Sequence, residues 1–179
     1  EIEKLGRVAL PVRADVSREK DVDDLVRKTI ERFGRVDVLV NNAGIGSFAR
    51  VAELSVEEFD RMWAVNMRGV FLCSRAIVPL MSRQRSGDIV NIASLAGRNA
   101  FVGGAGYAAT KWALTGFSRC LMLEVREQNV RVITLCPGSV DTTFGPPDQE
   151  RKDASRIPRS EDIAQVIVDT ILVPRNVMV

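Results

Sequence analysis

A short apolar run that ends in small and polar residues stands at positions 36–44 and reads Val36-Asp37-Val38-Leu39-Val40-Asn41-Asn42-Ala43-Gly44. Its valines and leucine predict a strand over residues 36–40, and the asparagines and glycine predict a turn after it. The preceding residues predict a helix with Ser17 as N-cap and Gly34 at its end. The apolar side chains of that helix recur at helical spacing: Val22, Leu25, Val26, Ile30 and Phe33.

The same alternation of strand and helix runs along the whole chain. Further strands are expected at residues 7–12, 89–93 and 130–135, and further helices from the Ser55/Glu58 capping box, over 107–128, and from about Ser160. Because long helices between strands require crossover connections, the predicted fold is α/β, a doubly wound, Rossmann-like parallel sheet in one domain over residues 1–179. Ligands bind at the carboxyl ends of such strands, where Asp15, residues 41–44, Ser94 and residues 137–140 fall.

The composition narrows the classes of function. Of the 179 residues, 46% are hydrophobic and 27% charged, as in an ordinary globular protein, and a net charge of +2 gives no reason to expect nucleic acid. Polar residues interrupt the long apolar segments and no signal peptide opens the chain, so we expect a cytoplasmic protein without a membrane span. Cys73, Cys120 and Cys136 are expected to be reduced core thiols. The absence of histidine excludes Ser–His and Cys–His nucleophiles, and no metal site is predicted.

Tyr107 is the only tyrosine, and Lys111 follows it four positions later on the same face of the predicted helix. A nearby positive charge favours the phenolate, so Lys111 is expected to lower the pKa of Tyr107 from its usual value near ~10 and to make it a general acid/base. Lys111 also lies on the apolar stripe of its helix, which predicts an inward lysine; the alternative is a lysine whose ammonium reaches back to solvent. Such a pair is common on ordinary helices, so its meaning depends on its surroundings.

Asn66 and Ser94 are two further polar residues in informative places. Asn66 lies on the apolar face of the helix that begins near Ser55, where a buried amide needs hydrogen-bond partners. It is either a core asparagine bonded to nearby backbone or one that orders water in a site. Ser94 ends a strand, and its hydroxyl is either that of a common turn serine or a donor to a substrate oxygen.

These residues occur together in the order and spacing of a known family. The matching pieces are the tetrad Asn41-Asn42-Ala43-Gly44, Asn66 in Val65-Asn66-Met67-Arg68-Gly69, Ser94 after Asn91-Ile92-Ala93, the Tyr107/Lys111 pair, and Pro137-Gly138-Ser139-Val140-Asp141-Thr142. On these motifs the chain resembles the short-chain dehydrogenase/reductase family over nearly its whole length.

The resemblance implies an oxidoreductase that transfers a hydride between NAD or NADP and a secondary alcohol or ketone. Tyr107 would be the acid/base, Lys111 would lower its pKa and hold the nicotinamide ribose, and Ser94 would steady the substrate oxygen. Asn66 would maintain a water-linked proton relay to Lys111. Besides Tyr107 and Lys111, the implied cofactor-binding residues are Asp15, Val16, Asn41, Ala43, Gly44, Pro137, Gly138, Val140 and Thr142.

One part of the family pattern is missing. The sequence has no glycine-rich phosphate loop, and it begins at Glu1 in what resembles the end of the family's second helix. We therefore expect a piece of a longer domain, cut also near Val177-Met178-Val179, which leads toward a final strand. A non-catalytic nucleotide-binding or scaffold protein of the same fold is the alternative; the missing loop favours it, and the intact set of Asn66, Ser94, Tyr107 and Lys111 opposes it.

The resemblance also implies a small-molecule substrate and a homodimer or homotetramer. The interface is expected on the helices that begin at Ser55 and Tyr107, with exposed apolar contacts from Phe71, Trp112 and Phe117. A partly apolar substrate pocket is expected from Leu95, Ala96, Phe101 and the loop beyond Phe144. The sequence does not choose between NAD and NADP.

Overall fold

The computed structural model describes residues 2–144 and 156–175. Three parallel strands form one sheet in the order β1 (Val38–Asn41), β2 (Gly87–Ile92), β3 (Val130–Leu135). Leu39 lies opposite Ile89, and Ile89 lies opposite Val132, so apolar side chains align across the sheet. The predicted α/β architecture with a parallel sheet is therefore confirmed.

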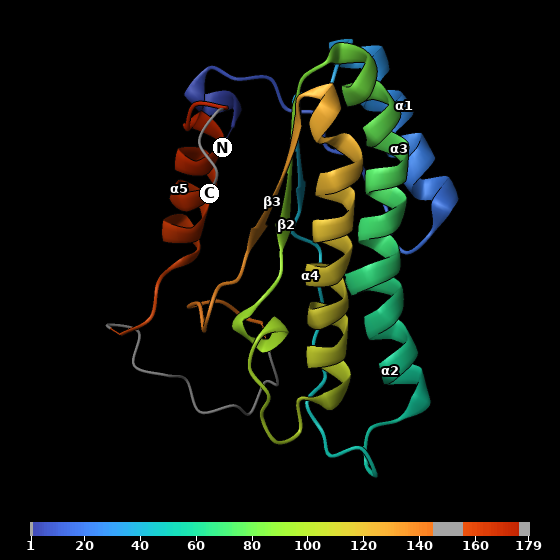
Figure 1. Ribbon diagram of the computed structural model, residues 1–179, viewed down its shortest axis with the longest axis vertical. Helices are drawn as coiled ribbons and strands as arrows, with labels where there is room; N and C mark the ends of the chain where they lie inside the picture. The colour runs from blue at the N-terminus through green and yellow to red at the C-terminus, as the bar shows by residue number, and fades with distance from the viewer. Residues whose placement is uncertain (1, 145–155, 176–179) are drawn as a thin grey trace.

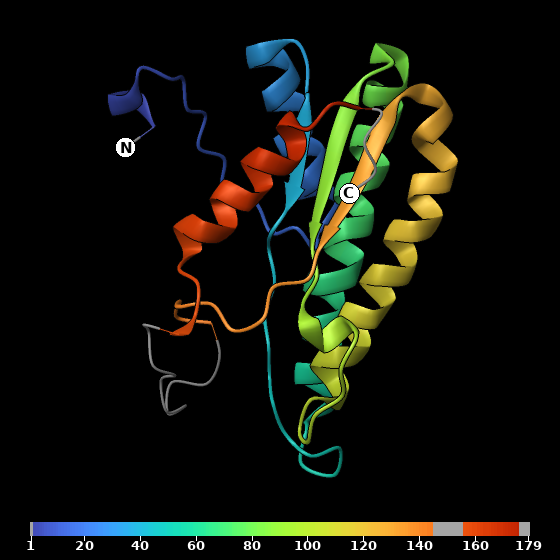
Figure 2. The same cartoon turned by 60° about the vertical axis from the view of Figure 1, so that its left-hand side comes forward.

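Helices lie on both faces of this sheet (Figures 1 and 2). On one side are α1 (Glu19–Phe33), α3 (Gly69–Gln84) and α4 (Ala105–Val125), and on the other is α5 (Ser160–Leu172). A π-helical turn, Ala64–Arg68, joins α2 (Val56–Trp63) to α3. Short 3-10 turns are found at Glu3–Leu5, Leu95–Gly97 and Arg126–Gln128.

The largest core cluster lies between the sheet and helices α3 and α4. Its buried members come from all of these elements: Ile77, Met81, Ile89, Leu121, Val125 and Val130. Burying a side chain of this size stabilises the fold by roughly 1.5–3 kcal/mol. The cluster therefore fixes α3 and α4 against β2 and β3, and with them the polar residues carried by those helices.

The capping predictions are confirmed at Ser55 and Gly34 and are wrong at Ser17. The Ser55 hydroxyl accepts a hydrogen bond from the Glu58 backbone N–H at 3.2 Å. Gly34 ends α1 in the left-handed region, with φ 78°. Ser17 instead donates its N–H and its hydroxyl to the Asp15 carboxylate, at 2.9 and 2.7 Å. Because that side chain is already engaged, α1 begins two residues later.

The strand predicted over residues 7–12 is wrong. That segment forms neither helix nor strand and pairs with no strand of the described sheet, and Val8 is 60% exposed. A strand is stabilised by the hydrogen bonds to its neighbour, and β1, at the edge of the described sheet, does not supply them to this segment. Alternating apolar residues therefore did not suffice here to make a strand.

Two predictions of burial need correction. Cys73 is buried and Cys136 half-buried, but Cys120 is exposed, since α4 turns Leu121 toward the core instead. Phe71 and Trp112 are exposed as predicted, whereas Phe117 is half-buried and packs against the core. Phe117 is therefore not one of the exposed contacts expected for an interface.

One helical run, Val56–Gln84, is long and apolar enough to cross a membrane by length and composition. Contrary to the expectation from the sequence, polar residues therefore do not interrupt every long apolar segment. However, 44% of the apolar window of this run is buried inside the protein. Val70, Leu72 and Ile77 of α3 belong to three different core clusters, which is the packing of a core helix.

Candidate active site

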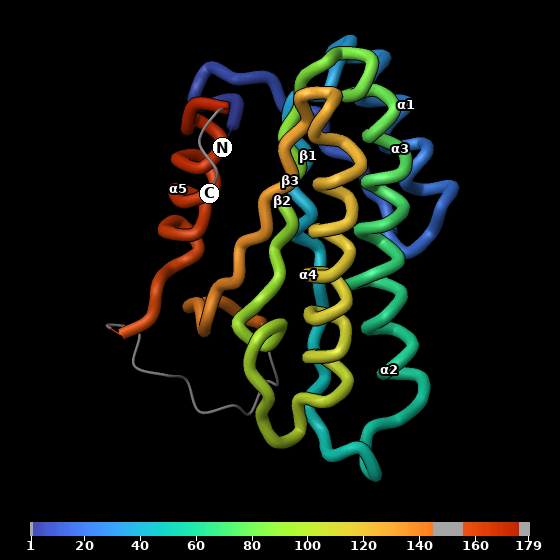
Figure 3. The backbone as a smooth tube through the Cα atoms, viewed as in Figure 1, coloured from blue at the N-terminus to red at the C-terminus, as the bar shows by residue number. Residues whose placement is uncertain are grey.

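The loops that follow the three strands leave the same end of the sheet, the end toward which α4 begins (Figure 3). Residues 41–44 end β1 and continue it, Ser94 follows β2, and Pro137 follows β3. The Leu95 N–H donates a hydrogen bond to the Pro137 carbonyl at 2.8 Å, which ties the second loop to the third. Sequence positions that are far apart are thus held at one end of the sheet.

Asn66 lies buried on the π-helical turn between α2 and α3. Its Oδ1 accepts a hydrogen bond from Ile45 N at 2.9 Å, and its Nδ2 donates to Ile45 O at 2.9 Å and to Thr110 Oγ1 at 3.0 Å. Of the two interpretations, the asparagine bonded to nearby backbone describes these contacts. They join the loop after β1 to α4. The helix predicted from Ser55 is interrupted at this point, and single π-helical turns are frequent at functional sites.

Lys111 points inward from α4 and is 6% exposed. Its Nζ donates a hydrogen bond to the Ile92 carbonyl, at the end of β2, at 2.9 Å. Burial lowers the pKa of Lys111 from 10.5 to about 8, and the nearby Cys136 opposes this shift. The inward orientation is confirmed, and the alternative of an ammonium in solvent is wrong.

Tyr107 is buried in the first turn of α4. Burial raises the pKa of its phenol, and a hydrogen bond with the Ser94 side chain lowers it in part. The prediction that Lys111 lowers this pKa is wrong for the structure as it stands. The reason is geometric: Lys111 Nζ lies over the face of the tyrosine ring, 5.7 Å from its centroid, and bonds to Ile92.

Ser94 ends the connection from β2 and begins a 3-10 turn. Its Oγ accepts a hydrogen bond from the Ala96 N–H at 3.1 Å, so the residue acts as the cap of that turn. The Ser94 side chain also lowers the pKa of the Tyr107 phenol in part, which indicates that the two side chains lie close together. The two interpretations of Ser94 are therefore compatible, because one hydroxyl oxygen can cap the turn and still face the tyrosine.

Small residues bring the neighbouring loops close to these side chains. A Cβ added at Gly44 would lie 3.5 Å from Asn66 Oδ1 and 3.7 Å from Lys111 Nζ. A Cβ added at Gly138 would lie 3.2 Å from Leu95 Cδ1, a tight contact. The loops after β1 and β3 therefore approach the site through their backbone.

Asn41 directs its amide into the sheet. Its Nδ2 donates to Asn91 Oδ1 at 2.8 Å, Asn91 Nδ2 donates to Ser118 Oγ at 2.8 Å, and the Ser118 hydroxyl donates to Leu114 O at 2.7 Å. All three side chains are buried. This polar chain links the end of β1 through β2 to α4, and it fixes the strand end from which the tetrad continues.

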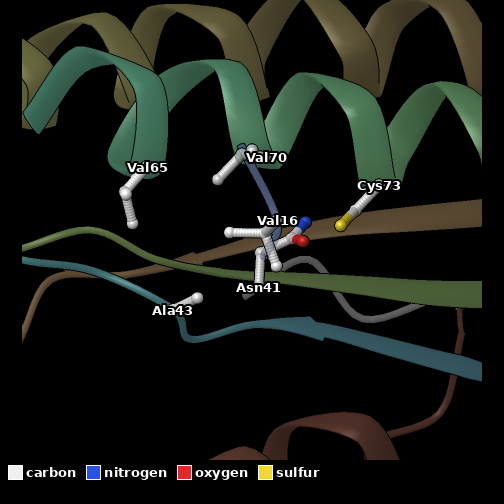
Figure 4. A pocket seen from close by; sticks show the side chains of 7 residues that line it. Val16, Asn41, Ala43, Val65, Val70 and Cys73 are labelled. Carbon is white, nitrogen blue, oxygen red and sulfur yellow. The ribbon is translucent and has the colours of Figure 1, made fainter. Parts of the chain in front are cut away.

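Val16, Asn41 and Ala43 come together at a small cavity under the helical run (Figure 4). Its other lining residues belong to that run: Val65, Gly69, Val70 and Cys73. A neighbouring predicted residue, Asp15, turns its exposed carboxylate to Ser17, and hydrogen bonds from the Ser17 side chain and backbone lower the pKa of that carboxyl.

The remaining predicted residues follow β3. Pro137 and Val140 are half-buried, while Gly138 and Thr142 are exposed. The Asp141 N–H donates to the Pro158 carbonyl at 2.9 Å, which places this segment beside the start of α5. The loop expected beyond Phe144 and the C-terminal residues 177–179 lie outside the described residues.

The structure also adds residues that the sequence did not single out. Thr110 and Ile45 hold Asn66, and the Ile92 carbonyl holds Lys111. A backbone acceptor has no signature in the sequence, so Ile92 could not have been found. Asn91 is a polar amide within an apolar strand, and such a residue predicts a buried polar contact at its position.

The donors of the site fit the hydroxyl-rich ribose of a nicotinamide cofactor. A lysine ammonium has three N–H donors, and among the described residues the hydrogen bond of Lys111 is to Ile92. Two donors of a buried ammonium thus remain for a ligand. Gly44 lets the backbone after β1 come close to this ammonium, since a Cβ there would lie 3.7 Å from Lys111 Nζ.

Comparison with known proteins agrees with this arrangement. The family model described as short chain dehydrogenase matches residues 1–153. A curated relative, 2-(R)-hydroxypropyl-CoM dehydrogenase of Xanthobacter autotrophicus, is 38% identical over 172 residues, which covers 91% of this chain and 69% of that protein.

Solved structures show the same likeness. The alcohol dehydrogenase of the archaeon Thermococcus sibiricus, complexed with 5-hydroxy-NADP, superposes with a TM-score of 0.90 at 33% identity, over 99% of this chain and 74% of that one. A 3-ketoacyl-ACP reductase from Sinorhizobium meliloti gives a TM-score of 0.87 at 32% identity, over 99% of this chain and 78% of that one. The names of these similar proteins carry different substrates, so likeness alone does not select one.

Proposed function

The chain belongs to the short-chain dehydrogenase/reductase family of NAD(P)-dependent oxidoreductases, and from that membership we propose that it interconverts a secondary alcohol and a ketone. The observation that carries the proposal is the grouping of buried Tyr107 and Lys111 with half-buried Ser94. An inward lysine with two unused donors, beside a phenol that faces a serine, has no evident purpose in packing.

Each side chain has a step that its position permits. When bound, the nicotinamide supplies or accepts the hydride at the carbonyl carbon. In reduction, Tyr107 donates its phenolic proton to the carbonyl oxygen, while the Ser94 hydroxyl donates a hydrogen bond to the same oxygen. Lys111 is protonated below its pKa of about 8, and its ammonium would hold the nicotinamide ribose through the donors that its bond to the Ile92 carbonyl leaves. Asn66 ties the loop at Ile45 to Thr110 on α4, which uses both of its Nδ2 hydrogens. We assign the second lone pair of its Oδ1 to a water-linked relay to Lys111.

The other predicted residues are proposed to hold the cofactor. Asp15 and Val16 would meet the adenine, and Asn41, Ala43 and Gly44 would line the adenosine ribose. The nicotinamide would lie against the segment after β3, at Pro137, Gly138, Val140 and Thr142. The cavity that Val16, Asn41 and Ala43 line together supports the assignment of Asn41 and Ala43 to the adenosine ribose. NAD and NADP both remain candidates.

We further propose that residues 1–179 belong to a single domain, that the protein forms a homodimer or homotetramer, and that it is cytoplasmic. The exposed rings of Phe71 on α3 and Trp112 on α4 support association through those helices. A groove beside Phe71, lined by Trp63, Ala64, Met67 and Arg68 as well, adds apolar surface there. The substrate is a small molecule and no nucleic acid is involved.

The test of this function is calorimetric titration of the purified protein with NADP and with NAD. Binding of either nucleotide is expected, and Lys111→Met should weaken it, because the donors to the ribose are lost. Lys28→Met, on the exposed face of α1, is the matched control and should leave binding unchanged. Absence of binding to both nucleotides would contradict the proposal. Nucleotide binding without hydride transfer to any ketone would instead favour the non-catalytic alternative.

A further inference from the structure

Thr110 lies on α4 with 0% of its surface exposed, and its hydroxyl is hydrogen-bonded both as acceptor and as donor. Its Oγ1 accepts a hydrogen bond from Asn66 Nδ2 at 3.0 Å and donates one to the Tyr107 carbonyl at 2.8 Å. Chemistry fixes these directions, because an amide NH2 only donates and a backbone carbonyl only accepts. Ile45 fixes the orientation of the Asn66 amide, since its N–H donates to Oδ1 and its carbonyl accepts from Nδ2. One chain of hydrogen bonds thus runs from the loop after β1 to the backbone of Tyr107.

The hydroxyl of Thr110 bonds differently from those of two other helical threonines. Thr29 on α1 and Thr170 on α5 each donate to the carbonyl four residues before them, at 2.8 and 2.7 Å. Thr110 donates to the carbonyl three residues before it, which is that of Tyr107. A helical threonine has both of these carbonyls within reach, and its rotamer selects one of them. At Thr110 the selected rotamer is the one that also receives the Asn66 amide, so Asn66 and Tyr107 share one hydroxyl.

The first turn of α4, which carries Tyr107, begins without a capping side chain among the described residues, because its N-cap is Gly104. The first backbone N–H groups of a helix lack partners within the helix, and helix ends fray. Tyr107 packs with Met62 and Ala96 in a core cluster, but apolar contacts have no preferred direction. The hydrogen bond from Thr110 is directional and acts on the Tyr107 backbone. It therefore fixes the rotation of this turn and with it the direction of the phenol.

The direction of the phenol matters because its neighbours come from different elements. Ser94 follows β2 and lies close to the phenol, and Lys111 Nζ lies 5.7 Å from the centroid of the Tyr107 ring. A proton donor must lie within hydrogen-bond reach of the atom that receives the proton. A misplacement of about 1 Å can lower the rate on the order of a hundredfold. A small rotation of the first turn of α4 would move the phenolic oxygen relative to Ser94.

Resting on the oxidoreductase function proposed above, we propose that Thr110 is a positioning residue for proton transfer by Tyr107. Its hydroxyl joins Asn66 to the Tyr107 carbonyl and so holds the phenol beside Ser94, where the oxygen of the substrate receives the proton. Thr110 does not touch the reacting atoms; it acts through the backbone of Tyr107. The loop after β1 and the proton donor on α4 are thereby kept in one fixed arrangement.

Because the chain has a single tyrosine, NMR can observe Tyr107 alone. Tyrosine labelled with carbon-13 at Cζ gives one signal, and no substrate or cofactor is needed to record it. Thr110→Val keeps the shape of the side chain and removes both hydrogen bonds, so the signal should shift by more than its linewidth or split. Thr110→Ser keeps the hydroxyl and should keep the wild-type signal. Thr170→Val, which removes a buried threonine hydroxyl from α5 across the sheet (Figure 2), is the matched control and should also keep it.

The kinetic readout is the reduction of ethyl acetoacetate and of 2-butanone with NADPH and with NADH. Thr110→Val should lower kcat about tenfold or more and leave KM within about threefold, because the proton donor is misplaced while the substrate still binds. Thr110→Ser should retain at least about a third of kcat, and Thr170→Val should match the wild type. If Thr110→Val does not fold, Thr110→Ser and Thr110→Ala, which differ only in the hydroxyl, take its place in both measurements.

An unchanged Tyr107 signal in Thr110→Val, or an equal loss of kcat in Thr110→Ser and Thr110→Val, would overturn the positioning role and leave the oxidoreductase function standing. A wild type that reduces neither ketone and binds neither nucleotide would overturn the oxidoreductase function. The NMR comparison decides whether Thr110 positions Tyr107 in either case, because it requires neither turnover nor a bound ligand.

Discussion

Replacing Lys111 with methionine is expected to stabilise the free protein at pH 7 while it removes a group that the proposed chemistry needs. Lys111 is buried, and its hydrogen bond is to the Ile92 carbonyl. A buried ammonium loses its hydration, and one backbone acceptor compensates for this only in part. The depressed pKa of Lys111 expresses that cost.

The magnitude follows from the pKa shift. The pKa falls from 10.5 to about 8, and each unit corresponds to about 1.4 kcal/mol, so at pH 7 the buried charge costs about 3 kcal/mol of unfolding free energy. Methionine also loses the hydrogen bond to Ile92, worth about 1 kcal/mol. The net gain in unfolding free energy for Lys111→Met is therefore about 2 kcal/mol.

The sign of the pH dependence gives a sharper test. Above about pH 8 folded Lys111 loses its proton, whereas in the unfolded chain it keeps the proton up to about 10.5. Wild-type stability should therefore rise between these values, by up to about 1.4 kcal/mol per pH unit, and the contribution of Lys111 should stay at its lowest level below about pH 8. Lys111→Met should lack this contribution.

Urea unfolding of the wild type and Lys111→Met at pH 7, 8, 9 and 9.5 measures the difference between their unfolding free energies. The contributions of the other titrating groups cancel in that difference. Lys28→Met, with its exposed side chain, should follow the wild type at every pH. The reasoning is refuted if Lys111→Met is less stable than wild type at pH 7, or if its pH dependence runs parallel to that of the wild type.

Two further predictions concern the scaffold. Buried Asp88 accepts a hydrogen bond from Arg131 Nε at 2.6 Å, so Asp88→Asn should lower the unfolding free energy by about 3 kcal/mol, as urea unfolding will measure; a loss below about 1 kcal/mol would show that the pair is dispensable. Among helical glycines, Gly69→Ala would place a Cβ 2.8 Å from Val16 Cγ2 and should destabilise the fold by about 1–3 kcal/mol, whereas Gly116→Ala meets nothing within 4 Å and should stabilise it by up to about 1 kcal/mol. Equal melting temperatures for the two alanine variants would contradict this contrast.

The sheet and its helices could be predicted because their apolar residues recur at the spacing of each element. The strand over residues 7–12 could not be judged in this way, since a strand also depends on the neighbour to which it bonds. The π-helical turn at Asn66 escaped prediction for a related reason. One extra residue in a turn leaves the apolar pattern of a helix almost unchanged.

The sequence indicated which residues form the candidate site, but it did not indicate how their pKa values shift. The apolar stripe of α4 indicated that Lys111 faces inward, but spacing alone did not show where its ammonium goes. The ammonium bonds to a backbone carbonyl and not to the phenol, which is why burial dominates the pKa of Tyr107. Phe48 was missed because a lone aromatic residue in a loop has no periodicity, and only the fold brings its ring to Tyr107.

The most direct test of the proposed function is hydride transfer by Tyr107→Phe, followed through the absorbance of the reduced nicotinamide. The phenylalanine keeps the ring contacts with Phe48 and Phe144 and removes only the proton donor. We predict a loss of kcat of about a hundredfold or more, the scale of general acid/base catalysis, with nucleotide binding retained and the melting temperature unchanged. Retention of more than about a tenth of the wild-type rate would contradict the role of Tyr107 as the proton carrier.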